Sequence, residues 1–380
     1  MGGGEIDRTN KQKQTARVKQ KRAKRLFCER CRRRDLRCLL LAVLPPELDG
    51  RFNRESHPDV LGDQRHLTLR DPANVAIFKL RSVALSCFRD FFFDKGFTEA
   101  TPPRAWSRRR SKAARRCSSP IISVKRPTSH RALNSISRRA FRAEGSSGRR
   151  HLAEFTHFEG ELGFITFTEL LTLLEEMVSG VTERIIAKAG PLLRHVNPHF
   201  VAPSEPFLRM DYEEAIRYLN EHQIYKDEDT KAPFVLGDDI PEAPERRLTD
   251  AIGRPILLCR FPAKLKSFYM QAIDQDEEES KANGDDPIVL TESVDLLLPG
   301  VGEVIGGSMR TWDHDKLMAG YAREGIDPTD YYWYTDLRKF GSVPHGGWGL
   351  GVERYLCWLM GQDHIRNVTL YPRSQGRCKP

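Results

Sequence analysis

Three short stretches of this 380-residue chain place arginine and carboxylate residues together beside glycine or apolar residues. They lie at 141–161, 301–310 and 344–354. Arginine neutralises phosphate groups through its planar guanidinium fork, and a carboxylate can hold the Mg²⁺ that accompanies nucleotide phosphates. An ordinary ion pair or a tight turn explains each stretch on its own, so a functional interpretation depends on the three together.

The candidate binding and catalytic residues come from all three stretches. They are Arg142, Glu144, Arg150, His151, Leu152 and Phe155 in the first, Glu303 and Arg310 in the second, and Gly351, Glu353 and Arg354 in the third. Trp348 and His157 are expected to pack within the fold, and Arg149 is compatible with either a surface or a ligand role. Arg142, Glu303 and Arg310 are the candidates for direct catalytic contacts.

The elements that must position these residues are only partly visible in the sequence. Apolar residues recur at helical spacing after Asp71-Pro72 until Gly96, and Thr166 with Glu169 forms a capping box for a helix that reaches about Gly190. Further helices are expected near 315–324 and 352–360. Strands are expected at 97–101, 255–261 and 288–298, with an acidic loop at 274–286. Because strands and helices do not alternate regularly, the predicted class is α+β around an antiparallel sheet.

The charge is distributed unevenly along the chain. The net charge is +9, but residues 1–40 hold 14 Lys/Arg against 4 Asp/Glu, and residues 104–140 hold 12 Lys/Arg and no acid. The remainder is therefore acidic, and an electrostatic case for nucleic-acid binding applies only to the two basic segments. No run of 18 apolar residues is present, and the basic start lacks the apolar core of a signal peptide, so we expect a cytoplasmic protein.

The N-terminal region has little periodicity. We expect residues 1–70 to form a basic, mostly disordered extension, with an ordered domain at 71–380. Cys28, Cys31 and Cys38 have the spacing of half a fungal zinc-cluster motif, but a zinc site normally needs four ligands. The eight sparse cysteines favour free thiols in a reducing compartment.

Taken in order, these stretches resemble the signature motifs of class II aminoacyl-tRNA synthetases. Phe88–Pro103 resembles motif 1, FRAE followed by RRHLAEFTHFEGE resembles motif 2, and GLGVER resembles motif 3. GEVIGGSMR, YYWYTD and DIPEAPE are similar to the asparaginyl branch. The resemblance covers His57–Pro103 and Phe141–Pro380.

This resemblance implies roles for the candidate residues. Arg142 would bridge the α-phosphate of ATP and the carboxylate of asparagine, and Arg310 would lie near the amino acid. Glu303 would coordinate Mg²⁺ close to Gly306. ATP would be bound by the set Arg142, Glu144, Arg150, His151, Leu152, Phe155, Glu303, Gly351, Glu353 and Arg354, with adenine between Phe155 and Arg354. No general base is needed, because the attacking carboxylate is already ionised.

The resemblance also implies partners. The expected activity is an asparagine–tRNA ligase, which forms asparaginyl-adenylate from ATP and transfers asparagine to tRNA(Asn). Phe88–Pro103 would form a homodimer interface. The anticodon-binding barrel that precedes this domain in the family is not recognisable in residues 1–70.

One internal segment departs from the family. Where relatives have CMVQTQVEGGSTLF and GEEAYLTQSSQLY, this chain has Ala105–Ser118 and Val124–Ile136. Possible codons for both family stretches, read one base later, give these residues without a mismatch. We therefore interpret residues 105–136, within an aberrant 104–140 region, as a sequence translated in the wrong frame. The loss of the amino-acid-binding loop predicts impaired activity.

Two other readings remain at this point. A stand-alone, tRNA-independent synthetase-like enzyme would also lack the anticodon barrel, although GGSMR and the C-terminal tail argue against it. A non-catalytic nucleic-acid-binding protein would use the basic arm, and the salt dependence of binding by residues 1–70 would reveal it.

Overall fold

The computed structural model describes residues 58–100, 133–141, 148–204, 206–227, 229–273 and 288–373, with backbone alone for 58, 59 and 133–141. The predictions for Cys28, Cys31, Cys38, Arg142, Glu144, most of 105–136 and the acidic loop lie outside these residues. The chain divides into two compact units, residues 1–76 and 77–380.

The first unit contains helices earlier than the sequence indicated. Helix α3 spans Pro58–Asp63 and helix α4 spans Arg65–Thr68. The Thr68 hydroxyl donates to the Leu61 carbonyl oxygen at 3.0 Å, and this bond ties the two short helices together. The expectation that order begins near Asp71 was therefore wrong, because tertiary contacts stabilise helices too short for a visible period.

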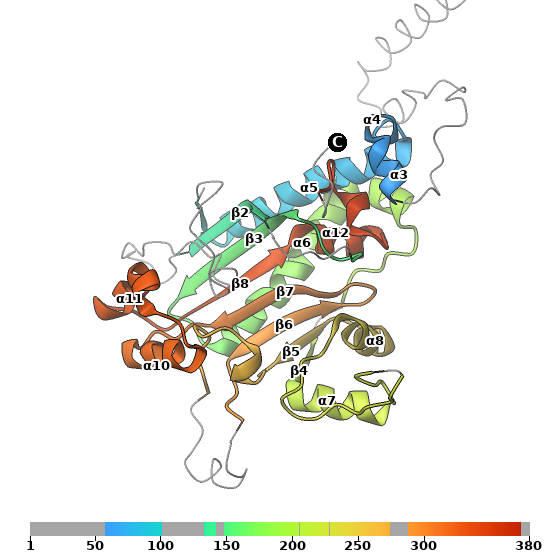
Figure 1. Cartoon of the computed structure of the whole chain (residues 1–380). Coiled ribbons are helices and arrows are strands. Elements are labelled where there is room, and N and C mark those ends of the chain that lie inside the picture. Colours follow the sequence, from blue (N-terminus) through green and yellow to red (C-terminus); the bar gives the residue numbers. More distant parts are fainter. Residues whose placement is uncertain are drawn as a thin grey trace, which may run out of the picture. The chain divides into compact units, whose positions relative to one another are not determined.

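The second unit is built on one eight-stranded sheet in the order β1-β2-β3-β8-β7-β6-β5-β4 (Figure 1). The strands are β1 Thr98–Glu99, β2 Leu133–Phe141, β3 Glu154–Gly163, β4 Leu208–Asp211, β5 Ile256–Cys259, β6 Ser293–Leu298, β7 Gly302–Met309 and β8 His345–Gly351. The outermost pairs, β1–β2 and β4–β5, are parallel, and the pairs between them are antiparallel. The predicted α+β class with an antiparallel sheet is confirmed.

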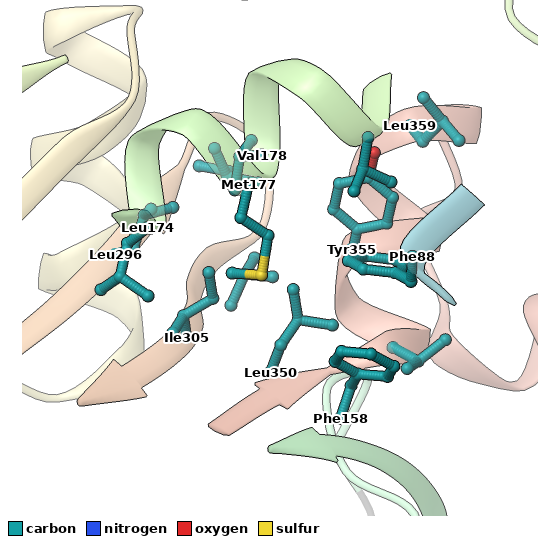
Figure 2. Packing of buried hydrophobic residues seen from close by; sticks show 14 of the residues in the cluster. Phe88, Phe158, Leu174, Met177, Val178, Leu296, Ile305, Leu350, Tyr355 and Leu359 are labelled. Atoms are coloured by element: carbon teal, nitrogen blue, oxygen red, sulfur yellow. The ribbon is translucent and has the colours of Figure 1, made fainter. Parts of the chain in front are cut away.

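Helices α5 (Pro72–Asp94), α6 (Phe167–Val196) and α12 (Val352–Met360) pack against one face of this sheet. Their apolar residues form one cluster with Phe158, Ile305 and Leu350 of the central strands (Figure 2). All three helices were predicted, and the capping box of Thr166 and Glu169 is present. The predicted end of α6 near Gly190 coincides with a kink, where Ala189 leaves helical geometry just before Pro191.

Most of the remaining helices pack in two further apolar clusters, one of which covers part of the opposite face of the sheet at β5 and β6 (Figure 1). The remaining helices are α7 Tyr212–Glu221, α8 Glu242–Ile252, η1 Ala263–Leu265, α10 His314–Glu324, η2 Pro328–Tyr331, α11 Tyr332–Lys339 and η3 Ile365–Val368. Helix α10 was predicted, whereas α7 and α8 were not. Within the described residues, no helix combines the length and apolar character needed to cross a membrane.

Candidate active site

The face of the sheet opposite the apolar cluster is polar at its centre. Alternate residues of a strand point to opposite faces, so Phe158 of β3 enters the apolar cluster while Glu159 and Glu161 face the other way. Strand pairing places Glu159, Gly349, Gly306 and Asp295 in one row across β3, β8, β7 and β6. This row has a carboxylate at each end and no side chain at its two central positions.

The glycines of β8 leave room for two side chains of β3 on this polar face. A Cβ atom at Gly349 would lie 2.5 Å from Nε2 of His157, and one at Gly347 would overlap the carboxylate of Glu161. The intervening residues, Trp348 and Leu350, are buried in the apolar cluster. Trp348 stacks on Phe92 and Phe158, which confirms its predicted packing role. In HGGWGLG, glycine and bulky residues alternate, so β8 has glycines on the polar face and packs Trp348 and Leu350 into the apolar cluster on the other. We call the glycine side of β8 the glycine floor.

A β-bulge directs Glu303 toward this floor. Glu303 and Gly306 are three residues apart, which in a regular strand would place them on opposite faces. The pairing of β6 with β7 shifts between Leu296 and Leu297, so Val304 is an extra residue. As a result, Oε1 of Glu303 lies 3.4 Å from the position of a Cβ at Gly306.

Two arginines converge on Glu303. Nη1 of Arg354 donates to its carboxylate at 3.0 Å and to its carbonyl oxygen at 2.8 Å, and Nη2 of Arg150 donates to the same carbonyl oxygen at 3.1 Å. Desolvation would raise the pKa of Glu303, but the charges of Arg354, Lys266 and Arg150 lower this pKa to about 2. Glu303 is therefore a permanent anion with a side chain that is 38% exposed, accessible to a cation.

Glu245 of α8 forms hydrogen bonds with both Glu303 and Arg150. Its Oε1 accepts the backbone N–H of Glu303 at 2.9 Å and Nη1 of Arg150 at 3.4 Å. Burial and the nearby negative charge of Glu303 raise the pKa of Glu245 to about 7, although Arg150 opposes this shift. The DIPEAPE stretch thus supplies a buried carboxylate that fixes Arg150 beside Glu303.

Asp295 of β6 completes a pair of carboxylates around Gly306. Its Oδ1 lies 3.6 Å from the position of a Cβ at Gly306, and its Oδ2 accepts Nζ of Lys266 at 2.5 Å. Burial raises the pKa of Asp295, while Lys266 opposes the rise. One or two carboxylates together with substrate phosphates are the usual ligands of Mg²⁺ in nucleotide sites. Glu303 and Asp295 fit that donor set.

Arg310 lies at the other end of the polar face, close to Glu161. Its Nη2 and Nε donate to Oε1 of Glu161 at 2.7 and 3.2 Å, and its Nη1 donates to the Ser308 hydroxyl at 2.7 Å. Its guanidinium carbon lies 5.3 Å from the ring centroid of Tyr269. Arg310 and Glu161 therefore place guanidinium N–H donors next to carboxylate acceptors.

His345 and Arg338 lie near this end of the polar face and contact each other. Nδ1 of His345 lies 2.7 Å from the Val343 carbonyl oxygen, and Nε2 of His345 lies 3.3 Å from Nη2 of Arg338. A carbonyl partner and a guanidinium partner together favour the neutral ring with its proton on Nδ1. Burial lowers the pKa of His345, in agreement with the neutral form.

A small pocket concentrates positive charge next to Glu303. Four arginines contribute to its wall: Arg149, Arg150, Arg246 and Arg354. The predicted residue His151 lies at the same place, with Nε2 3.4 Å from Nη2 of Arg354. Asp363 also lines this pocket, and the excess of arginine gives it the positive charge that favours phosphate groups.

The structure thus brings together most of the described candidates. Gly351 ends β8 directly before α12, Phe155 is partly buried beside the apolar cluster, and Leu152 is buried in that cluster. Glu353 is 2% exposed, with both carboxylate oxygens bonded to protein groups, and this argues against a direct contact with ATP.

Sequence reasoning missed Asp295 and Lys266, and it gave no role to Glu161 and Glu245 although both lie in the stretches that resemble the family. A lone carboxylate inside the apolar strand SVDLLL was a usable signal for Asp295, because buried acids are rare without a functional or paired role. Lys266 has no comparable signal, since its pairing with Asp295 depends on the folded sheet.

Comparison with known proteins agrees with this architecture. Residues 135–375 match the model of the family "tRNA synthetases class II (D, K and N)". The chain is 47% identical to the cytoplasmic asparagine–tRNA ligase of Bos taurus and 46% identical to that of Homo sapiens, in each case over 87% of this chain. It spans 59% and 61% of the length of those two relatives.

A solved structure gives the same result. Asparaginyl-tRNA synthetase of Entamoeba histolytica, in complex with asparaginyl-adenylate, superposes with a TM-score of 0.75 at 40% identity, over 89% of this chain and 76% of that one. The antiparallel sheet with its glycine floor and arginine–carboxylate pairs is thus a class II synthetase catalytic fold. The chain belongs to the class II tRNA synthetases (D, K and N), and within them to the asparaginyl-tRNA synthetases.

Proposed function

We propose that this chain is the catalytic part of an asparagine–tRNA ligase, which activates asparagine with ATP and transfers it to tRNA(Asn). The observation that supports this most is the position of the Glu303–Arg354 pair and the Arg310–Glu161 pair on one open face of the sheet. The first pair fits a nucleotide with its metal, and the second fits a small polar amino acid. The adenylate in the Entamoeba histolytica relative joins these two ligands.

Fixed charge would supply most of the catalysis. Two anions must meet when the asparagine carboxylate attacks the α-phosphate, so preorganised positive groups stabilise the transition state. Arg150 would hold the outer phosphates, and Glu303 with Asp295 would hold Mg²⁺ brought in with ATP. The metal would screen phosphate charge. Arg142, at the attacking carboxylate, and Glu144, at the adenosine, remain the proposed contacts of the motif 2 stretch.

Recognition of asparagine follows from Arg310 and Glu161. A carboxamide has one acceptor oxygen and one donor NH₂ group, which complement the guanidinium donors and the carboxylate acceptor at this end of the site. Phe155 and Arg354 would enclose adenine. We further propose a cytoplasmic location, in line with the names of the relatives. We also propose a homodimer with Phe88–Pro103 in the interface, and tRNA(Asn) as the macromolecular partner.

Activity of the chain as it stands should be low. Residues 105–136 replace the stretch that should hold asparagine, and orientation of reactants can contribute roughly 7 kcal/mol or more to rate. We therefore expect negligible asparagine-dependent pyrophosphate exchange by the 380-residue chain. Robust exchange by this chain would contradict the proposed impairment.

The activity itself is tested in a recoded chain, in which residues 105–136 are replaced by the sequence that the other reading frame encodes. Asparagine-dependent exchange of pyrophosphate into ATP should appear, and Glu303→Gln should reduce its rate on the order of 100-fold or more. Glu213→Gln, an exposed carboxylate on α7, is the matched control and should have no effect. Undiminished pyrophosphate exchange by the Glu303→Gln protein would contradict the proposed role of Glu303 in asparagine activation.

A further inference from the structure

Glu353, next to Arg354, participates in a buried network rather than facing the open side of the sheet. It lies in the first turn of α12, its side chain is 2% exposed, and its Oε1 accepts Nη2 of Arg81 at 2.7 Å. Its Oε2 accepts the backbone N–H of Thr156 at 2.9 Å. Each carboxylate oxygen therefore already has a strong donor.

Arg81 of α5 links three other elements at once. The same Nη2 donates to the Thr156 hydroxyl at 2.8 Å, and Nη1 donates to the Val368 carbonyl oxygen at 3.1 Å. Its side chain is 17% exposed. The planar guanidinium fork therefore joins β3, the start of α12 and the end of η3.

The chain neighbours of this network are residues of the proposed nucleotide site. Thr156 directly follows Phe155 on β3, and Glu353 directly precedes Arg354 on α12. Phe155 and Arg354 are the two groups proposed to enclose adenine. The network consequently connects the backbones of the two walls of the adenine site through side chains that do not reach the ligand.

We propose that Arg81 and Glu353 are positioning residues that set the separation of Phe155 and Arg354. This inference rests on the proposed function, because it presumes that a nucleotide base enters between those two side chains. Removing the network should weaken recognition of the base and leave binding of the phosphates nearly intact, since Arg150, the proposed phosphate contact, is held by Glu245 and Glu303 outside the network. A purely structural role would weaken both equally.

The double variant Arg81→Met with Glu353→Gln tests this inference. Removing both charges avoids the uncompensated buried charge that a single variant would leave. Calorimetric titration of the full chain with Mg-ATP should show affinity reduced by about tenfold, the size expected from loss of one base–aromatic stack. Affinity for Mg-tripolyphosphate, which has no base, should be unchanged.

Two further variants complete the design. Arg81→Lys keeps the charge and should fold normally, yet show an intermediate loss of ATP affinity. Lys226→Met with Asp238→Asn removes a 2.5 Å ion pair remote from the site and should change neither affinity. Equal ATP affinity in the unaltered chain and the double variant would overturn the inference, as would parallel losses for both ligands. Failure of the unaltered chain to bind Mg-ATP would overturn the proposed function and this inference with it.

Discussion

At the scale of single residues, charge pairs formed across long sequence separations define the site. Arg150 and Glu245 are 95 residues apart in sequence, and Arg310 and Glu161 are 149 apart. The sequence identified Arg150, Glu303, Arg310 and Arg354 because arginine and carboxylate residues occur together in stretches that resemble family motifs. Which residues would pair was not identified, because local periodicity contains no information about which distant side chain will lie opposite.

Arg310→Lys should impair asparagine use selectively. A lysine cannot reproduce the paired donors that reach Glu161, and a charge-assisted hydrogen bond contributes about 1.5–3 kcal/mol. In the recoded chain we expect kcat/KM for asparagine to fall by about 10- to 100-fold. Calorimetry should show unchanged Mg-ATP affinity, and an equal loss for ATP would contradict the separation of the two sites.

His345 should make stability depend on pH in a defined direction. Burial holds its folded pKa below its unfolded value of 6.5, so the unfolded state binds more protons between these two values. The stabilisation is complete above pH 6.5 and is lost as pH falls through the folded pKa. Between pH 7.5 and pH 5, the midpoint temperature of thermal unfolding should fall less steeply for His345→Gln than for the unaltered chain. Parallel curves would exclude this contribution.

At the scale of elements, strongly periodic helices were the most predictable. Helices at 72–94, 167–196, 314–324 and 352–360 were anticipated because their apolar residues recur on one face. The strands β3, β7 and β8 contain the motifs, yet the sequence did not identify them as strands. Their glycines and charges obscure the two-residue period, since the positions on the polar face of the sheet are not apolar. Helix α8 was missed for a related reason: its stretch is mostly polar and contains proline.

The glycine floor of β8 can be tested directly. Gly349→Ala places a methyl group against Nε2 of His157, and overpacking of this kind usually costs about 1–3 kcal/mol. A lower midpoint of thermal unfolding and weaker Mg-ATP binding should follow. Gly163→Ala on β3, where the nearest atom would lie 3.5 Å away, is the matched control and should be nearly neutral. Equal unfolding midpoints and equal Mg-ATP affinities for the two variants would contradict the requirement for glycine at position 349.

At the scale of the whole molecule, the segment between β1 and β2 is the part of the sequence that departs from the family. The structure assigns Leu133–Phe141 to β2, so the last residues of the interval 105–136 pair with β3. The frame-shift interpretation of residues 105–136 stays a prediction.

The nucleotide sequence provides the decisive measurement for that interpretation. Read one base away from the present frame, the codons of this segment should encode a GGST-containing stretch and a nearby TQSSQ-like stretch. A different reading would mean that residues 105–136 evolved as a basic loop. The recoded chain used to test the proposed function would then have no justification.

The junction of β8 and α12 has a consequence for how the gene can change. No residue separates Gly351, the last of β8, from Val352, the first of α12. A single inserted codon here would rotate every later side chain by about 100° around the helix axis. Glu353 would then leave Arg81, and Arg354 would leave Glu303. Natural length variation should consequently be absent from this junction, while substitutions and distant loops remain free to vary.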